Sequence, residues 1–150
     1  MDKSPNLEII LIEDDMSDAE LTIRALKKNK LINKVVLLKD GEEAIDYLFV
    51  RGGYTAELPD NNSRLILLDL KLPGMSGLEV LKRIKQDDRT KHILVVILTS
   101  SKENPDIEEC YRLGANSYIV KPVEFENFSN AVTQIGLYWL LLNHPPVSPS

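Results

Sequence analysis

Five short apolar runs recur along the chain, and each is followed by polar or charged residues. They cover residues 7–12, 35–38, 65–68, 93–98 and 117–120. Runs of this length are too brief for a helix and are typical of strands that are buried on both faces of a parallel sheet. Segments with apolar residues at helical spacing lie between them. The pattern therefore predicts strands that alternate with helices.

Capping signals mark the expected beginnings of the helices. Ser17 and Ser76 each stand three residues before a glutamate, which is the spacing of a capping box. Asp40 offers a cap to the second helix, and Asn104 followed by Pro105 offers one to the fourth. We expect helices over about residues 17–30, 40–51, 76–87, 104–114 and from 124 past Trp139, with a surface loop at 52–63 and a disordered tail at 144–150.

Strands that alternate with helices predict a doubly wound α/β domain with a five-stranded parallel sheet, because β-α-β crossovers bring successive strands back in the same direction. The carboxyl ends of all the strands then meet at one edge, where open α/β sheets bind their ligands. Polar residues at the ends of four runs gather there: Glu13, Asp14, Asp15, Asp69, Thr99 and Lys121. This edge is the candidate site.

Asp69 is the centre of this group, since it ends the middle run and precedes a loop broken by Pro73 and Gly74. Taken alone, it would be read as a loop aspartate that caps a turn. Crowded carboxylates repel one another and need a cation, and oxygen ligands suit Mg²⁺ better than zinc. A lysine and a hydroxyl nearby are the complement for an anion held on that metal. The convergence of these groups predicts phosphoryl transfer to an aspartate.

With these motifs in place, the sequence resembles the response-regulator receiver domains of two-component signalling over nearly the whole chain. The resemblance is carried by Glu13-Asp14 after the first strand, LLDLKLPGMSG around Asp69, LTS around Thr99, and Tyr118-Ile-Val-Lys121-Pro122. It implies one receiver domain over residues 1–143, with the flavodoxin-like fold of that family and the sheet order 2-1-3-4-5.

The resemblance also implies roles for the matching residues. Asp69 is expected to accept the phosphoryl group in a Mg²⁺-dependent reaction, while Thr99 and Lys121 hold the phosphoryl oxygens. Tyr118 is the expected switch aromatic, and the peptide before Pro122 is expected to be cis. The side chains of Asp14 and Asp69 and the backbone carbonyl of Lys71 are the expected Mg²⁺ ligands, and Glu13 is expected to help hold the ion through water.

Other classes of protein share parts of this pattern. A haloacid-dehalogenase-like phosphatase also uses a strand-end aspartate, but it needs a second aspartate where this chain has Lys71. A flavodoxin-like cofactor binder needs a Ser/Thr-rich phosphate loop, which does not follow the first strand. A receiver-like interaction module that works without phosphorylation is the remaining alternative, although every motif residue of a receiver is present.

The partner implied by the resemblance is a sensor histidine kinase, whose phosphohistidine supplies the phosphoryl group. The loop at 52–63 and the final segment YWLLLNHPP resemble single-domain receivers that partner bacterial phytochrome kinases. The expected output is a conformational change that is read by a downstream protein. The expected chemistry is limited to phosphoryl uptake and slow hydrolysis of the acyl phosphate, so we do not expect an enzyme. Asp15 is an extra acid, for which we expect a capping or solvent-facing position.

Composition narrows the partners and the compartment. The net charge of −5 and the pI near 5.1 argue against a nucleic-acid partner, which would need clustered Lys and Arg. Cys110 is the single cysteine, so no intrachain disulfide can form, and the N-terminus lacks the pattern of a signal peptide. The apolar stretch 135–142 is too short to span a membrane. We therefore expect a cytoplasmic protein without a membrane partner.

The last helix is expected to carry more apolar surface than one domain can bury. A stripe at spacings of three and four would dock it on the sheet: Phe125, Phe128, Val132, Ile135, Trp139 and Leu142. Tyr138 and Leu141 lie off that stripe, and a helix that is apolar all round needs a further cover. We expect a homodimer with Tyr138, Trp139 and Leu141 at its interface, the alternative being a final turn that folds back onto the monomer.

Overall fold

The computed structural model describes residues 6–28, 32–49 and 62–136 of the 150-residue chain. Its strands are β1 (Asn6–Ile12), β2 (Ile32–Leu38), β3 (Asn62–Asp69), β4 (Leu94–Thr99) and β5 (Ser117–Val120). Its helices are α1 (Met16–Leu26), α2 (Gly41–Phe49), α3 (Gly77–Gln86), α4 (Asp106–Leu113) and α5 (Phe125–Gln134). Strands and helices alternate along the chain, as the sequence predicts.

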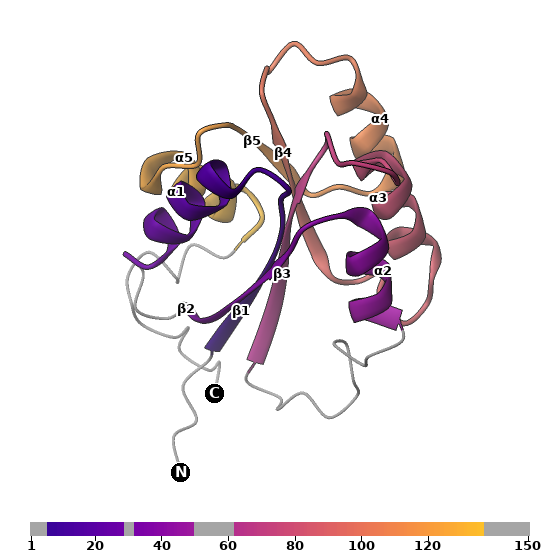
Figure 1. The fold of residues 1–150 in the computed structure, drawn as a ribbon, viewed down its shortest axis with the longest axis horizontal. Helices are drawn as coiled ribbons and strands as arrows, with labels where there is room; N and C mark the ends of the chain where they lie inside the picture. Colours follow the sequence, from indigo (N-terminus) through magenta and orange to yellow (C-terminus); the bar gives the residue numbers. More distant parts are fainter. Residues whose placement is uncertain (1–5, 29–31, 50–61, 137–150) are drawn as a thin grey trace.

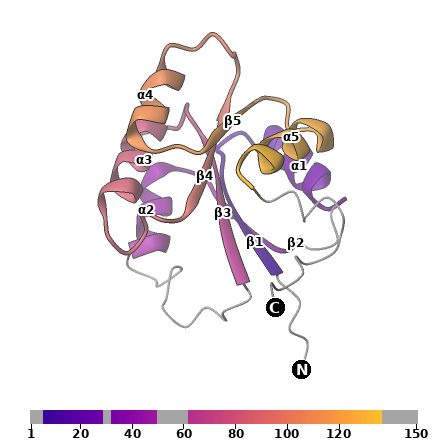
Figure 2. The same cartoon turned by 180° about the vertical axis from the view of Figure 1, so that it is seen from behind.

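The strands form one parallel sheet with the order β2-β1-β3-β4-β5. The predicted doubly wound α/β fold is therefore confirmed, including its strand order. α1 and α5 cover one face of the sheet, and α2, α3 and α4 cover the other, as Figure 1 and the view from behind in Figure 2 show.

The side chains of β1 and β3 alternate between two buried clusters. Ile10 and Leu68 point into the cluster beneath α2, α3 and α4, whereas Leu11 and Leu67 point into the cluster beneath α1 and α5. All four side chains are fully buried, and burial of one side chain of this size contributes roughly 1.5–3 kcal/mol. Burial on both faces explains why these strands are apolar without interruption.

Two of the predicted helix caps are confirmed. Ser76 Oγ accepts a hydrogen bond from the Glu79 N–H at 3.2 Å at the start of α3. Asp40 Oδ1 accepts one from the Glu43 N–H at 2.7 Å at the start of α2. In both helices a side-chain oxygen thus satisfies a backbone N–H that has no partner within the helix.

The predicted start of α1 is wrong by two residues. The N-cap is Asp15 rather than Ser17, because Asp15 Oδ1 accepts a hydrogen bond from the Asp18 N–H at 3.0 Å and the helix begins at Met16. A carboxylate at this position also interacts favourably with the helix dipole. The helix ends at Leu26, earlier than the predicted position near residue 30.

α4 begins at Asp106, one residue later than the pattern predicts. Pro105 forms the N-cap, and Asn104 Oδ1 accepts a hydrogen bond from the Asp106 N–H at 2.9 Å. The helix is closed by Gly114, as predicted, and the φ of +112° at this residue is a left-handed conformation that glycine adopts without a steric penalty.

α5 ends earlier than the apolar pattern predicts. Phe128 and Val132 are buried against the sheet as expected, but the helix stops at Gln134, and Gly136 has a φ of +86°. A glycine in this conformation commonly terminates a helix, so the prediction of one helix through Trp139 is wrong. The predicted interface residues Tyr138, Trp139 and Leu141, the tail at 144–150 and most of the loop at 52–63 lie outside the described residues.

Candidate functional site

The carboxyl ends of four strands meet at one edge of the sheet. The predicted site residues occupy or follow these ends: Glu13, Asp14, Asp69, Thr99 and Lys121. The parallel register aligns them, because Asp69 lies opposite Leu98 in β4 and Thr99 lies opposite Val120 in β5. Residues that are up to 108 positions apart in the sequence are thereby placed in hydrogen-bond contact.

Asp69 is held through both of its carboxylate oxygens. Oδ1 accepts a hydrogen bond from the Lys71 N–H at 3.0 Å, and Oδ2 accepts one from Lys121 Nζ at 3.0 Å. The residue is only 3% exposed. After Asp69 the chain forms a loop and comes back against its own backbone at Gly77. A Cβ added to Gly77 would lie 2.7 Å from Leu70 Cα. A side chain at position 77 would therefore displace the backbone next to Asp69.

Lys121 is the cation of the site and contacts three carboxylates. Its Nζ donates to Glu13 Oε1 at 3.1 Å, to Asp18 Oδ2 at 3.0 Å and to Asp69 Oδ2 at 3.0 Å. Asp18 was not among the predicted site residues. It lies in the first turn of α1 rather than at a strand end, so the search along the strand ends did not include it.

The charges at this edge are out of balance. Burial raises the pKa of Glu13 to about 8, with a further increase from the hydrogen bond and the negative charge of Asp69, while Lys121 acts in the opposite direction. Burial alone would lower the pKa of Lys121, but its hydrogen bonds to Asp69, Asp18 and Glu13 outweigh that effect and raise the pKa. Both shifts favour the protonated form, which shows that the site favours additional positive charge.

Three carboxylates at this edge form a group that could hold a metal ion. Glu13, Asp14 and Asp69 each offer one oxygen, and these oxygens all lie within 4.8 Å of one another. Glu13 and Asp69 are buried, whereas Asp14 is exposed and leaves the group open to solvent. A set of hard oxygen donors with an open side fits Mg²⁺, which binds to few carboxylates and keeps several waters.

Thr99 lies beside Asp69 and is 1% exposed. Its Oγ1 donates a hydrogen bond to the Ser101 carbonyl at 3.1 Å and accepts one from Asn104 Nδ2 at 3.4 Å. A small cavity of about 40 Å³ opens between the two groups, lined by Asp69, Leu70, Lys71, Thr99, Ser100, Asn104 and Lys121. Sequence reasoning assigned Asn104 only to the helix cap and missed its place at this cavity.

The sequence model of one protein family, the response regulator receiver domain, matches residues 9–133 of the chain. The chain belongs to the response regulator receiver family. This receiver domain therefore belongs to the proteins of two-component signalling, as the motifs predict. No helix in the described parts of the chain is both long and apolar enough to cross a membrane.

Two curated relatives match most of this receiver domain. The probable methanogenesis regulatory protein FilR2 of Methanothrix harundinacea is 39% identical over 92% of this chain and 86% of its own length. The response regulator Rcp1 of Synechocystis is 36% identical over 93% of this chain and 92% of its own length.

Solved structures of similar receiver domains include a bacteriophytochrome response regulator and a metal-bound protein. The bacteriophytochrome response regulator RtBRR has a TM-score of 0.76 and 47% identity, covering 93% of this chain and 83% of its own. The Mn²⁺-bound form of Rcp1 has a TM-score of 0.69 and 35% identity, covering 95% of this chain and 100% of its own. The predicted likeness to phytochrome-associated response regulators is confirmed.

Two further residues of the receiver motif lie on β5 and just beyond it. Tyr118 is half-buried against the cluster beneath α4, and its ring meets the ring of Tyr111 edge to face, with centroids 6.4 Å apart. The Lys121–Pro122 peptide bond is cis. Tyr118 thus connects α4, through its ring, with β5, the strand that leads to Lys121.

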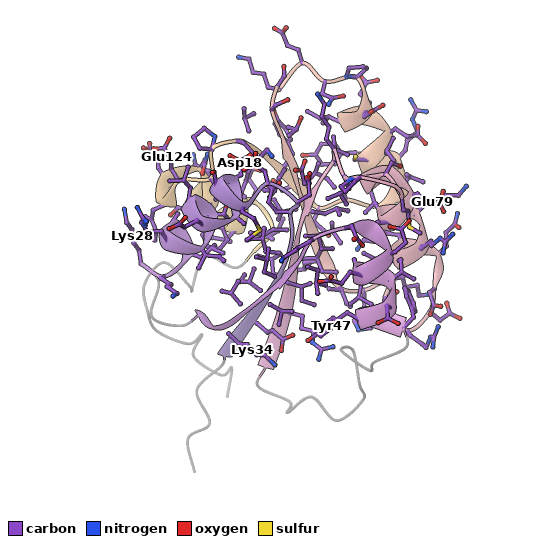
Figure 3. The ribbon with its side chains drawn as sticks, viewed as in Figure 1. Asp18, Lys28, Lys34, Tyr47, Glu79 and Glu124 are labelled. Atoms are coloured by element: carbon purple, nitrogen blue, oxygen red, sulfur yellow. The ribbon has the colours of Figure 1, made fainter. Side chains whose placement is uncertain are left out.

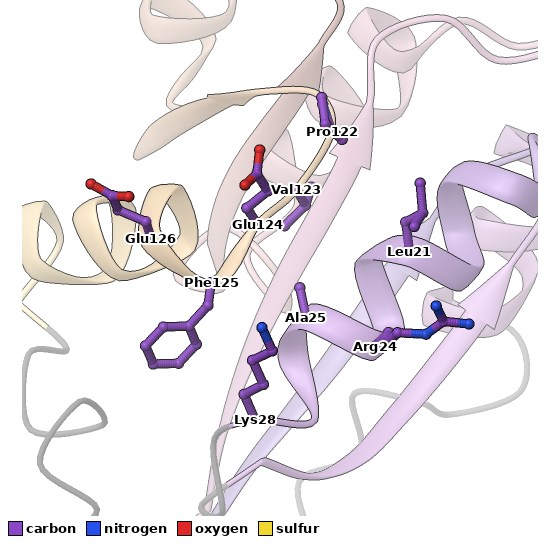
Figure 4. A pocket seen from close by; sticks show the side chains of 9 residues that line it. All are labelled: Leu21, Arg24, Ala25, Lys28, Pro122, Val123, Glu124, Phe125 and Glu126. Atoms are coloured by element: carbon purple, nitrogen blue, oxygen red, sulfur yellow. The ribbon is translucent and has the colours of Figure 1, made fainter.

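A larger groove lies beside the site, between α1 and the segment that leads into α5 (Figure 4). It has a volume of about 560 Å³, and Leu21, Ala25, Val123 and Phe125 supply apolar side chains to its lining. Leu21 is 46% exposed, so its side chain is open to solvent at this groove. α1 therefore contributes both to the acidic site, through Asp18, and to this apolar groove.

Proposed function

We propose that this receiver domain accepts a phosphoryl group on Asp69 from a phosphohistidine of a sensor histidine kinase. The observation that carries the proposal is the geometry of Asp69, a buried carboxylate that borders a small cavity, with the ammonium of Lys121 3.0 Å away and the hydroxyl of Thr99 on the same cavity. A carboxylate nucleophile and two groups suited to phosphoryl oxygens are the parts that this reaction needs.

The transfer moves one phosphoryl group without any change of oxidation state. An oxygen of Asp69 attacks the phosphorus, a P–O bond forms and the P–N bond to the histidine breaks. The departing imidazole nitrogen keeps the electron pair of that bond and becomes neutral or takes a proton from solvent. Lys121 donates to an oxygen of the transferred group and balances part of its negative charge.

Mg²⁺ is the metal that we propose for this site. The side chains of Glu13, Asp14 and Asp69 and the backbone carbonyl of Lys71 would hold it, which fits the carboxylate oxygens within 4.8 Å of one another. A bound Mg²⁺ supplies Lewis-acid stabilisation of the negative charge on the phosphoryl oxygens. The Mn²⁺-bound structure of the similar protein Rcp1 supports a divalent cation for this receiver domain.

Thr99 and Tyr118 are the proposed switch. A phosphoryl group on Asp69 would compete with the Ser101 carbonyl for the hydrogen bond that Thr99 donates at 3.1 Å in this structure. The segment after β4 would then move, and Tyr118 would change its position beside α4. A downstream protein would read this change of surface.

The proposal is tested at Asp69 itself. Asp69→Asn removes the nucleophilic oxygen and should abolish labelling by acetyl phosphate and by a phosphorylated kinase. Asp88→Asn is the matched control, because Asp88 has a 93% exposed side chain and pairs with Lys91 away from the site. Full labelling of Asp69→Asn would contradict the assignment and would favour a receiver-like module that works without phosphorylation of this residue.

The switch is tested separately with Thr99→Ala. This variant should still be labelled on Asp69, but its backbone amide resonances beyond β4 should shift less on phosphorylation than those of the wild type. Identical shifts in the two proteins would contradict the role of Thr99.

A phytochrome-type kinase is the proposed phosphodonor, and the similarity to RtBRR supports it. The proposal implies a cytoplasmic location, where kinase and receiver meet. Transfer from a phytochrome-type kinase should be faster than transfer from an unrelated histidine kinase to the same chain. Equal rates would remove the case for this partner.

A homodimer through Tyr138, Trp139 and Leu141 is also proposed, within a receiver domain that covers residues 1–143. Its support is the apolar composition of residues 137–142, because the argument from a continuous helix fails at Gly136. Sedimentation should show a dimer at micromolar concentration, and Tyr138→Asp combined with Leu141→Asp should give a folded monomer. A monomeric wild type would contradict it.

A further inference from the structure

Lys121 contacts three carboxylates. Glu13 and Asp69 lie at strand ends, where the sheet brings them together, but Asp18 lies on a helix. The residue lies in the first turn of α1, where Figure 3 labels it. Its Oδ2 accepts a hydrogen bond from Lys121 Nζ at 3.0 Å across 103 positions of the sequence. The backbone N–H of Asp18 is itself fixed by the side chain of Asp15, so the N-cap of α1 orients this carboxylate.

All three N–H donors of the Lys121 ammonium are directed at carboxylates. The distances from Nζ are 3.1 Å to Glu13, 3.0 Å to Asp18 and 3.0 Å to Asp69. An ammonium has three donors and no more. A phosphoryl oxygen can therefore gain a hydrogen bond from Lys121 only when one of these carboxylates gives up its own.

Asp18 is the carboxylate that can be released at the lowest cost. Its side chain is 35% exposed, whereas the side chains of Glu13 and Asp69 are 0% and 4% exposed. Water can solvate a released Asp18, but no water can reach the fully buried side chain of Glu13 to replace the hydrogen bond that it would lose. Asp18 also lies outside the group of carboxylates that could hold a metal ion, so its release leaves that group intact.

We propose that Asp18 is a positioning residue that holds Lys121 in the resting state and competes with the incoming phosphoryl group for the ammonium. This inference rests on the proposed phosphorylation of Asp69. Asp18 slows phosphoryl uptake in two ways, because it occupies one donor of Lys121 and because its negative charge repels an anionic phosphodonor. The rate of uptake thus depends on a residue of α1 that is neither the nucleophile nor a metal ligand.

The test compares the wild type with Asp18→Asn. Asparagine has nearly the same shape but no negative charge, so its amide oxygen accepts a weaker hydrogen bond from Lys121 than the carboxylate does and releases the donor more easily. With acetyl phosphate and Mg²⁺ at low salt, the initial rate of labelling of Asp69 should rise by about threefold, a modest effect because the removed charge is partly exposed. The increase should shrink as salt is added, since salt screens exposed charges.

Two further variants separate a contact with Lys121 from a general change of charge. Glu20→Gln removes the same charge from the same helix, but Glu20 pairs with Arg24 and is 73% exposed. Its labelling rate should match the wild type. Asp18→Glu restores the negative charge and should return the rate towards that of the wild type. Thermal unfolding of each variant shows that the compared proteins are folded.

The outcomes separate this inference from the proposed function. A faster Asp18→Asn with an unchanged Glu20→Gln supports the competition for Lys121. An unchanged or slower Asp18→Asn, or an equal rise in Glu20→Gln, overturns it while the labelled wild type still supports phosphorylation of Asp69. A wild type and variants that all remain unlabelled overturn the proposed function and this inference together.

Discussion

β1 and β3 carry ionisable residues near both of their ends, and the two edges of the sheet use them differently. Near the amino ends, Glu8 lies opposite Arg64 and the two form a largely buried ion pair with 3.6 Å between Arg64 Nε and Glu8 Oε1. At the carboxyl ends, one ammonium faces the carboxylates of Glu13, Asp18 and Asp69. The amino-edge pair is balanced in charge, and the carboxyl-edge cluster is not.

This difference separates a structural pair from a reactive site. Among the described residues, Glu8 Oε1 and Arg64 Nε and Nη1 have no hydrogen-bond partner, so the contact between Arg64 Nε and Glu8 Oε1 is an ion pair without a hydrogen bond. The excess of carboxylates at the other edge is costly unless protons or cations are added. The unbalanced edge is therefore the one that can exchange a metal ion and an anion with solvent.

The largest change in the free energy of unfolding is expected when one charge of the pair at the amino edge is removed. Arg64→Ala leaves the carboxylate of Glu8 buried without a counter-charge and should lower the free energy of unfolding by roughly 3 kcal/mol. The measurement is denaturant unfolding at neutral pH. The labelling rate of Asp69 in the folded variant should be unchanged, because Arg64 lies near the amino end of β3 and Asp69 lies at its carboxyl end.

The control replaces both charges together. Glu8→Leu combined with Arg64→Leu removes the stranded carboxylate and should recover most of the stability lost in Arg64→Ala. If Arg64→Ala loses less than about 1 kcal/mol, the pair does not behave as a buried ion pair and the comparison of the two edges fails.

A smaller effect is expected at the carboxyl edge, where Asp14 completes the carboxylate group. Asp14→Ala should weaken Mg²⁺ binding by at least about tenfold, or about 1.4 kcal/mol, because one oxygen ligand is lost. Isothermal titration with Mg²⁺ measures the change in Kd. Asp88→Asn removes an exposed carboxylate elsewhere and should leave the Kd unchanged, whereas an unchanged Kd in Asp14→Ala would contradict the metal assignment.

The sequence predicts the sheet well because strands that are buried on both faces appear in it as uninterrupted apolar runs. An uninterrupted apolar run such as Leu65 to Leu68 has few other interpretations when turn formers surround it. The site follows from the same signal, since parallel strands end at one edge and carry their terminal residues there. Asp69, Thr99 and Lys121 could therefore be placed together before any contact was known.

Two features were beyond the reach of local patterns. Asp18 lies on α1 and contacts Lys121, which follows β5. A single contact between a helix and the end of a distant strand leaves no periodic pattern in the sequence. The end of α5 was missed for a different reason: the apolar positions continue past Gly136, so periodicity favoured a longer helix, while the positive φ of one glycine decided its end.

Cys110 is a third site with a buried ionisable group, and it lies at neither the amino edge nor the carboxyl edge of the sheet. It lies on α4 within the apolar cluster and is 1% exposed. Burial raises the pKa of its thiol to about 11, and the nearby carboxylates of Asp106 and Glu109 act in the same direction. Cys110 should therefore stay neutral, whereas Glu13 and Asp69 each accept a hydrogen bond from the ammonium of Lys121.

The smallest expected change in stability follows from the raised pKa of the Cys110 thiol. A thiol that holds its proton more tightly in the folded state than its usual pKa of 9.0 contributes stability below that value and loses it as the pH rises towards 11. At pH 10, relative to pH 8, the wild type should lose about 1 kcal/mol more stability than Cys110→Ala, in which this titration is removed. Unfolding in denaturant at the two pH values measures the difference. An equal loss in both proteins would show that the thiol can ionise within the fold, and the contrast between balanced and unbalanced buried groups would then not extend to α4.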